Sequence, residues 1–446
     1  MRGFKLRLVS SGGCVLLLAA LISCKDEKPG PKPMTDAGTD GGVQAMSSTV
    51  VYASVGKSMK VFSLDSTSGA LAQTSAVENL RNDVHYAAMS PNGKVLYVSV
   101  SEIPPPTDRE HINLIYAFNV DGKTGGLTQL GEPFALPSTL SRAIHITVDN
   151  TGTYLLMAHN FAEAAAVLKL QPDGRVGELV MQPANPKLGF LAHQIRVDPS
   201  NKFAFVPVRG NDQQMVMADG GTTTVPEMVG HMAVYSFNAG VLTPGQMINY
   251  ETGIGPRHLD FHPTMPWVYV GMERGNLLVT YKLEAGMLTE LFRTTTLGDT
   301  SFKFPAQRAG AIHVHPNGKY VYIANRNVAP CAASVPCPMK ETKPFAGGEN
   351  NIAVFSIEAN GEPKIVERVE AHGFEARSFT LDPSAQFMVV GNQMNIVRKD
   401  GDQLVDVLPN LSVFRVGADG KLTFLKAYDQ SGGQLWWTAA YKLSGS

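Results

Sequence analysis

Cysteine is scarce in this sequence. Its 446 residues include only Cys14, Cys24, Cys331 and Cys337. So few thiols exclude a disulfide-dense scaffold. No second cysteine pair or nearby histidine pattern completes a structural zinc set, so we expect no metal site and no cofactor.

Charge of one sign is also lacking, because 38 lysines and arginines nearly balance 39 aspartates and glutamates. Without a basic patch, nucleic acid is not an expected partner. The motifs Gly-x-Ser-x-Gly, the P-loop and Gly-x-Gly-x-x-Gly are absent as well. Serine hydrolase, nucleoside triphosphatase and dinucleotide-binding functions therefore lack support.

Long apolar runs are missing too. The apolar stretch near the N-terminus, Val15 to Ile22, is shorter than the about 20 residues that a spanning helix needs. It follows three basic residues and ends in Leu21-Ile22-Ser23-Cys24, which resembles the lipobox of bacterial lipoproteins. We expect residues 1–23 to be a lipoprotein signal peptide, with Cys24 lipidated and the protein anchored outside the cytoplasm, in the periplasm or at the cell surface. A plain signal peptide is the alternative.

The segment after this cysteine is rich in proline, glycine, aspartate and lysine and offers almost nothing to bury. Residues 24–48 are therefore predicted to be a disordered tether. Residues 49–446 are long enough for a single large domain without a second one. In an extracytoplasmic protein, Cys331 and Cys337 are expected to form a disulfide, with free thiols or a metal site as alternatives.

One sequence pattern recurs six times within residues 49–446. It consists of a short apolar strand, a turn with proline or glycine, and a second strand that is often rich in aromatic residues. The turns begin at Ser90, Asp149, Asp198, His262, His315 and Asp382. Their spacing of about 49 to 67 residues suits one four-stranded propeller blade with its loops.

A third strand follows in seven copies, from Val61-Phe62-Ser63-Leu64 to Val413-Phe414-Arg415-Val416. The count predicts an all-β, seven-bladed β-propeller with four antiparallel strands per blade. The first inner strand is missing at the N-terminus, where the chain enters on Val50-Val51-Tyr52-Ala53. We expect the C-terminal segment Leu435–Ala439 to complete blade one and close the ring, which removes exposed sheet edges.

Inner strands of a propeller start on the face where second strands end, so residues at these two positions converge around one mouth of the channel. Seven charged or titratable residues occupy such positions. They are His145, His193, Arg257, His258 and Arg377 near inner-strand starts, and Glu273 and Arg326 just after second strands.

The sequence motifs around these residues resemble those of a known protein family. In order along the chain, these are Gly255-Pro256-Arg257-His258 followed by Met272-Glu273, then Asn325-Arg326, then Arg377-Ser378-Phe379 with Asn392-Gln393. The chain resembles the β-propeller lactonase family in this series of short motifs. This family includes propeller-type 6-phosphogluconolactonase and carboxymuconate-lactonizing enzyme. The resemblance extends from about Val50 to the last blade and implies hydrolysis of a small cyclic ester, acidic or sugar-derived, without a metal.

The resemblance also implies a site. His193, Arg257, Glu273 and Arg326 match the family's catalytic positions, and His145, His258 and Arg377 are expected to bind substrate. The two arginines could stabilise the oxyanion of the transition state. Glu273 and His193 could move protons, in either assignment. One departure is Gly310-Ala311-Ile312, where family members often have a glutamate in place of Ala311.

Other interpretations remain open. Arginines at strand ends can simply pair with carboxylates of neighbouring blades, and His262 and His315 occupy turn positions. His313 and His315 alternate onto one strand face, but the sequence offers no third metal ligand. The chain could also be a non-catalytic scaffold that binds a protein, glycan or small ligand through its loop-rich face. We expect a monomer whose partner is a small lactone or anionic ligand, with membrane contact only through the lipid.

Overall fold

The computed structural model describes residues 48–102, 112–140, 142–160, 165–183, 189–211, 214–216, 222–224, 228–300, 307–328 and 344–445. The expected signal peptide, the tether with Cys24, and the pair Cys331 and Cys337 lie outside these ranges. Within them, no helix is long and apolar enough to cross a membrane.

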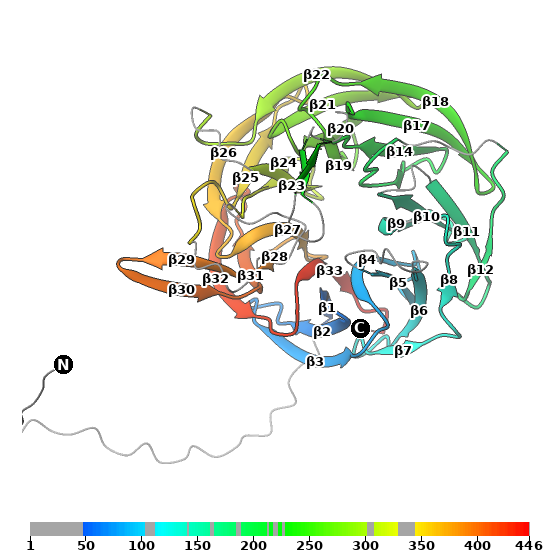
Figure 1. Ribbon diagram of the computed structural model, residues 1–446, viewed down its shortest axis with the longest axis horizontal. Helices are drawn as coiled ribbons and strands as arrows, with labels where there is room; N and C mark the ends of the chain where they lie inside the picture. Colours follow the sequence, from blue (N-terminus) through cyan, green and yellow to red (C-terminus); the bar gives the residue numbers. More distant parts are fainter. Residues whose placement is uncertain are drawn as a thin grey trace, which may run out of the picture. The chain divides into compact units, whose positions relative to one another are not determined.

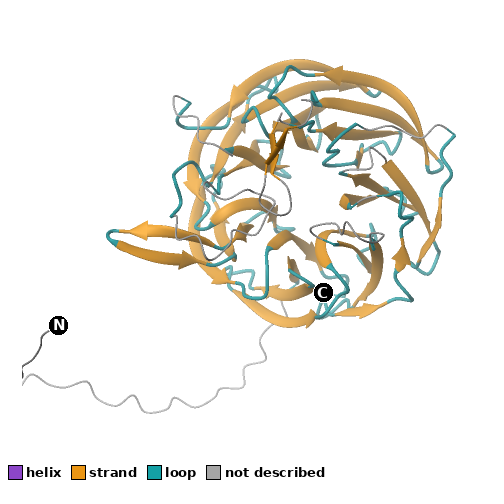
Figure 2. Cartoon of the chain, in the orientation of Figure 1, coloured by secondary structure: helices purple, strands orange, loops and turns teal. Residues whose placement is uncertain are grey.

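The regular elements of the described chain are strands, arranged as seven four-stranded antiparallel sheets around a central axis (Figures 1 and 2). From the inner to the outer strand, blade one consists of β33 (Leu435–Lys442), β1 (Thr49–Val55), β2 (Ser58–Leu64) and β3 (Leu71–Val77). Blade two consists of β4 (Asp83–Met89), β5 (Val95–Ser101), β6 (Leu114–Val120) and β7 (Leu127–Gln129), with β8 (Phe134–Ala135) also paired to β6. Blade three consists of β9 (Ala143–Val148), β10 (Tyr154–His159), β11 (Ala165–Leu170) and β12 (Val176–Leu179).

The remaining blades repeat this order. Blade four consists of β13 (Arg196–Val197), β14 (Phe203–Val208), β17 (His231–Asn238) and β18 (Val241–Asn249), and blade five of β19 (Pro256–Phe261), β20 (Trp267–Met272), β21 (Leu277–Glu284) and β22 (Met287–Thr295). Blade six consists of β23 (Arg308–Val314), β24 (Tyr320–Arg326), β25 (Asn351–Ile357) and β26 (Pro363–Glu370), and blade seven of β27 (Phe374–Leu381), β28 (Phe387–Met394), β31 (Asn410–Val416) and β32 (Leu422–Asp429). Two hairpins, β15 (Gln214–Val216) with β16 (Thr222–Thr224) and β29 (Ile396–Asp400) with β30 (Gln403–Val407), are inserted between second and third strands. The second hairpin extends outward from the ring (Figure 1).

The recurring turn has a local cause. Oδ1 of Asp198 accepts hydrogen bonds from the backbone N–H groups of Lys202 and Phe203, at 3.0 and 2.9 Å, and so ties the inner strand to the second strand. His262 replaces this aspartate in blade five, where its Nδ1 accepts from the N–H groups of Thr264 and Met265. The structure therefore confirms the interpretation of His262 as a turn residue.

The aromatic second strands lie in the core between blades. Tyr97 donates a hydrogen bond from its hydroxyl to the carbonyl of Gly174 in the next blade at 2.8 Å. The same bond joins Tyr52 to Gly125, Tyr269 to Gly361 and Tyr322 to Gly420. A buried hydroxyl needs such a partner, so each tyrosine fixes the position of its blade against the next one.

The ring closes as predicted, because β33 pairs antiparallel with β1 and places Tyr52 opposite Ala439. The hydroxyl of Thr438 donates to the carbonyl of Tyr52 at 2.9 Å. The backbone N–H of Trp437 donates to Oγ of Ser54 at the same distance. The two ends of the domain thus form one blade, and no open sheet edge remains at the junction.

Removing the side chain of Trp437 tests this closure. Trp437 is buried in the core that blades one and two share, so Trp437→Ala should lower the free energy of unfolding by about 3–5 kcal/mol through lost burial and a residual cavity. Chemical denaturation measures this. Leu404→Ala is the control, because Leu404 is 49% exposed on the β30 hairpin and its loss should change stability by less than about 0.5 kcal/mol. Equal stability of the two variants would contradict the closure argument.

Candidate active site

Five charged side chains from three blades meet at the end of the ring where second strands finish and inner strands begin. Arg209 and Glu273 directly follow β14 and β20, and Arg326 ends β24. Arg257 is the second residue of inner strand β19, and Arg308 begins inner strand β23. The antiparallel order of each blade brings these positions together although they are far apart in sequence.

Glu273 is the centre of this group and is only 2% exposed. Its Oε1 lies 3.1 Å from Nε of Arg209, 3.2 Å from Nη2 of Arg326 and 3.6 Å from Nη1 of Arg308. Its Oε2 lies 3.1 Å from Nε of Arg257. We call these five residues the arginine–glutamate cluster. One carboxylate therefore contacts four guanidinium groups.

The charge states follow from these contacts. Burial alone would raise the pKa of Glu273, but Arg209, Arg326, Arg257 and Arg308 outweigh burial and hold the pKa far below its usual value. Glu273 is therefore an anion at any physiological pH and a poor proton acceptor. Burial, together with nearby Arg326, lowers the pKa of Arg257 to about 9, so Arg257 stays cationic at neutral pH.

A second buried carboxylate, Glu375, supports the cluster from β27. It pairs with Nη1 of Arg326 and is 1% exposed. Its backbone has φ of 58°, in the left-handed region that costs a non-glycine residue roughly 1–3 kcal/mol. The side chain of Asn350 accepts a hydrogen bond from the Glu375 N–H at 2.9 Å and holds this conformation. Arg326 is thus fixed between two carboxylates.

His193 lies beside the cluster. Its Nε2 is 4.0 Å from Oε2 of Glu273, and its Nδ1 is buried without a hydrogen-bond partner among the described residues. Burial and the nearby charge of Arg257 lower its pKa well below 6.5. His193 is therefore a neutral imidazole at neutral pH. Of the two proton-transfer candidates, it is the one that can accept a proton.

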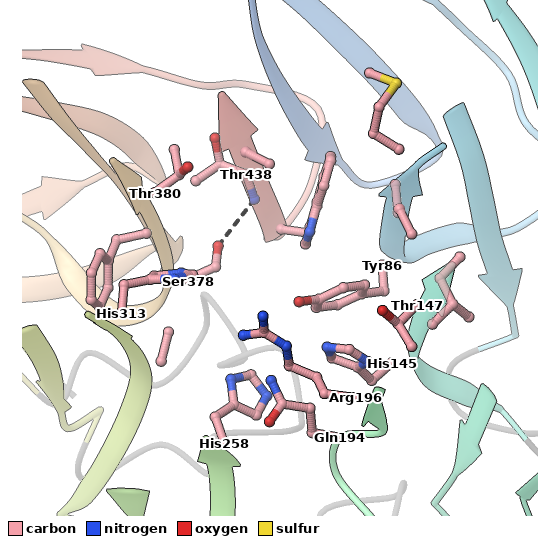
Figure 3. A pocket seen from close by; sticks show the side chains of 18 of the residues that line it. Tyr86, His145, Thr147, Gln194, Arg196, His258, His313, Ser378, Thr380 and Thr438 are labelled. Atoms are coloured by element: carbon pink, nitrogen blue, oxygen red, sulfur yellow. Dashed lines mark hydrogen bonds between the residues drawn. The ribbon is translucent and has the colours of Figure 1, made fainter. Parts of the chain in front are cut away.

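The three expected substrate-binding residues occupy different places. Nδ1 of His258 lies 3.2 Å from Nη1 of Arg257, so His258 borders the cluster. The His145 ring lies 5.9 Å from the His258 ring, and both line a cavity in the central channel (Figure 3). Arg377 lies over the ring of Trp436 at 4.5 Å and forms no ion pair with any described residue. The four expected catalytic residues thus come together, whereas His258 and His145 lead from the cluster into the channel and Arg377 stacks on Trp436.

The sequence analysis missed Arg209, Arg308 and Glu375. Arg209 follows a second strand just as Glu273 does, and Arg308 and Glu375 lie at the starts of inner strands. The rule that selected the other candidates therefore applied to these three residues as well. At the position of the family departure, Ala311 lines the channel cavity and packs in the hydrophobic core with Tyr322 and Phe379, so it is not part of the cluster. His313 lies 3.6 Å from Asp260, while Nδ1 of His315 accepts from the N–H of Asn317 in its turn.

Comparisons with known proteins indicate the family. A family model described as lactonase, seven-bladed β-propeller, matches residues 48–395. The 6-phosphogluconolactonase of Bacillus subtilis is 28% identical over 337 residues, which cover 74% of this chain and 83% of that protein. The 6-phosphogluconolactonase of Yersinia pestis is 25% identical over 387 residues, covering 84% and 92%.

A solved structure supports the fold. The periplasmic gluconolactonase of Pseudomonas aeruginosa aligns with a TM-score of 0.67 at 19% identity and covers 89% of this chain and 99% of its own. Because the family model covers most of the chain, the protein belongs to the seven-bladed β-propeller lactonase family. This membership makes it a lactonase-type carboxylic ester hydrolase.

Removing the anchor of Arg326 should destabilise the fold. Glu375→Ala leaves Arg326 buried with one carboxylate fewer, and loss of one partner of a buried pair costs about 3–5 kcal/mol. Denaturant titration of the variant measures the loss, and Glu375→Gln should recover part of it through a hydrogen bond to Arg326. Glu284→Ala, at a site where the carboxylate is exposed, should leave stability unchanged. A stable Glu375→Ala protein would mean that Glu375 does not anchor Arg326.

Proposed function

We propose that the protein hydrolyses a small acidic or sugar-derived lactone at the arginine–glutamate cluster, without a metal, while anchored to the bacterial envelope through Cys24. The observation that carries this proposal is the convergence of a neutral histidine, His193, with fixed guanidinium groups around Glu273. A non-catalytic scaffold would not need these groups to meet. The convergence therefore supports an enzyme.

The chemistry follows from the charges. Attack of water on the lactone carbonyl creates negative charge on the carbonyl oxygen, which Arg257 and Arg326 can stabilise because they are already fixed in place. Neutral His193 accepts the proton of the attacking water. Glu273, whose Oε2 lies 4.0 Å from Nε2 of His193, stabilises the imidazolium that forms. His193 then gives this proton to the ring oxygen as the ester bond breaks, which yields the hydroxy acid.

The cluster favours an anionic substrate. The four arginines of the cluster outnumber the two carboxylates, Glu273 and Glu375, and nearby Arg377 makes no ion pair with a described residue. When a guanidinium stacks on a tryptophan ring, its N–H groups lie in its own plane and are available to bind a carboxylate or phosphate group. Arg377 is accordingly proposed to hold the acidic group of the substrate.

The proposed location narrows the choice of lactone. The curated relatives are 6-phosphogluconolactonases, whose substrate forms in the cytosol. The lipobox-like sequence ending at Cys24 supports export, and an exported enzyme would meet other lactones. We therefore propose that 6-phosphogluconolactone is not the physiological substrate.

Loss of Arg257 should remove transition-state stabilisation. Arg257→Ala is expected to lower kcat/KM for lactone opening by about 10²–10³-fold, as for other lost oxyanion donors. A pH-indicator assay over a panel of sugar and dicarboxylic lactones measures acid release. Arg293→Ala, which alters a surface ion pair on β22, is the control and should match the wild type. Unchanged turnover by Arg257→Ala would remove Arg257 from the mechanism.

The pH dependence should report His193. The base must be unprotonated, and the pKa of His193 in the folded protein lies well below 6.5. Activity should therefore stay constant as the pH falls through 6.5 and decline only at lower pH, where His193 gains a proton. Initial rates of a reactive lactone between about pH 4.5 and 7 test this. An acid limb with a midpoint at or above pH 6.5 would contradict the assignment of His193 as the base.

A further inference from the structure

The central channel contains a second candidate site beyond the arginine–glutamate cluster. It is a cavity of about 360 Å³ lined by residues from the inner strands, or the segment just before them, of all seven blades. Figure 3 shows side chains from these blades around it, among them Tyr86, His145, Gln194 and His258. None of Arg257, Glu273 and Arg326 lines this cavity.

Two buried side chains in its wall carry polar atoms that have no hydrogen-bond partner among the described residues. Gln194 is 4% exposed, and its Oε1 accepts from the N–H of Leu259 at 2.7 Å. The amide nitrogen of Gln194 makes no hydrogen bond to a described residue. His145 is 3% exposed, and neither of its ring nitrogens is hydrogen-bonded within the described chain. Buried polar groups normally have partners, so these two point to a ligand.

The fixed charges of the wall cancel. Arg196 pairs with Asp260 at 2.6 Å, and Nδ1 of His313 lies 3.6 Å from the same carboxylate. Burial, together with nearby arginines, lowers the pKa of His145 and His258 well below 6.5, so both are neutral. In contrast to the cluster, this cavity offers a ligand no excess of positive charge.

The remaining wall groups suit hydroxyl groups and flat ring faces. Oγ of Ser378 accepts from the N–H of Thr438 at 3.1 Å and keeps its own proton to donate. The hydroxyl of Thr147 makes no hydrogen bond to a described residue. The Tyr86 ring lies 4.1 Å from the His145 ring and 5.9 Å from the Trp437 ring, which provides an apolar wall on one side.

We propose that this cavity binds a neutral, hydroxyl-rich molecule such as a sugar ring or cyclic polyol, held by Gln194, His145 and Thr147 against Tyr86. The wall offers donors, such as the amide nitrogen of Gln194, and groups that can also accept, such as the hydroxyl of Thr147, which suits hydroxyl groups because each can both donate and accept. The volume fits a single ring of this size. The site does not depend on whether the cluster opens lactones.

Direct binding tests the proposal. The probes are D-glucose and myo-inositol, with gluconate as the anionic comparison. They are titrated into the full chain by calorimetry and by tryptophan fluorescence, since Trp437 lines the cavity. Saturable binding of at least one neutral probe, tighter than gluconate, is the expected result. No binding of either neutral probe, or tighter binding of gluconate, would overturn it.

Variants locate the binding. His145→Leu leaves no described protein group unpaired and should weaken binding by about tenfold or more through one lost hydrogen bond. Thr147→Val, which keeps the shape of the side chain, should weaken binding to a smaller extent. This variant provides the test if His145→Leu does not fold. Thr280→Val is the matched control, because Oγ1 of Thr280 is buried without a partner outside the cavity. Wild-type affinity in both cavity variants would refute the site, whereas binding without lactone turnover would refute only the proposed function.

Discussion

Closure of the ring by β33 and β1 is the constraint on which the site depends. Strands from both ends of the domain share one sheet, so all seven inner strands face a common axis. Arg209, Glu273 and Arg326 come from three blades and meet because each follows or ends a second strand at the same end of the ring. An open stack of the same blades would leave these groups facing water.

The rigid ring also explains how so much charge is buried. A carboxylate or guanidinium taken out of water costs several kcal/mol unless its partners are already in place. Glu273 contacts four arginines and Arg326 contacts two carboxylates, so each charge compensates several others. The tyrosine bonds between neighbouring blades fix the positions from which these side chains reach. The site is therefore organised before a substrate arrives, as electrostatic catalysis requires.

The fold could be predicted from the sequence because its signal is repeated. Six turns and seven third strands recur along the chain, and together they fix the blade count and the closing strand. The site could be predicted only in part. Convergence at the mouth follows from topology, but the partners of Glu273 depend on the reach of side chains from other blades, and Arg209 heads a long insertion that hid its equivalence to Glu273. The left-handed backbone of Glu375 depends on Asn350, 25 residues away, and has no sequence signal.

The arginines have a second effect that reaches beyond their own ion pairs. Burial is the largest cause of the lowered pKa of His145, His193 and His258, and the charge of Arg257 lowers the pKa of each ring further. The same cationic group that can stabilise an oxyanion thus keeps the adjacent histidine neutral and able to accept a proton. It also keeps the channel histidines neutral. Along β19 the chain passes from charged Arg257, through His258, to the paired Asp260 of the cavity. A short inner strand therefore separates a cationic region, suited to acid groups and developing negative charge, from a neutral region suited to hydroxyl groups.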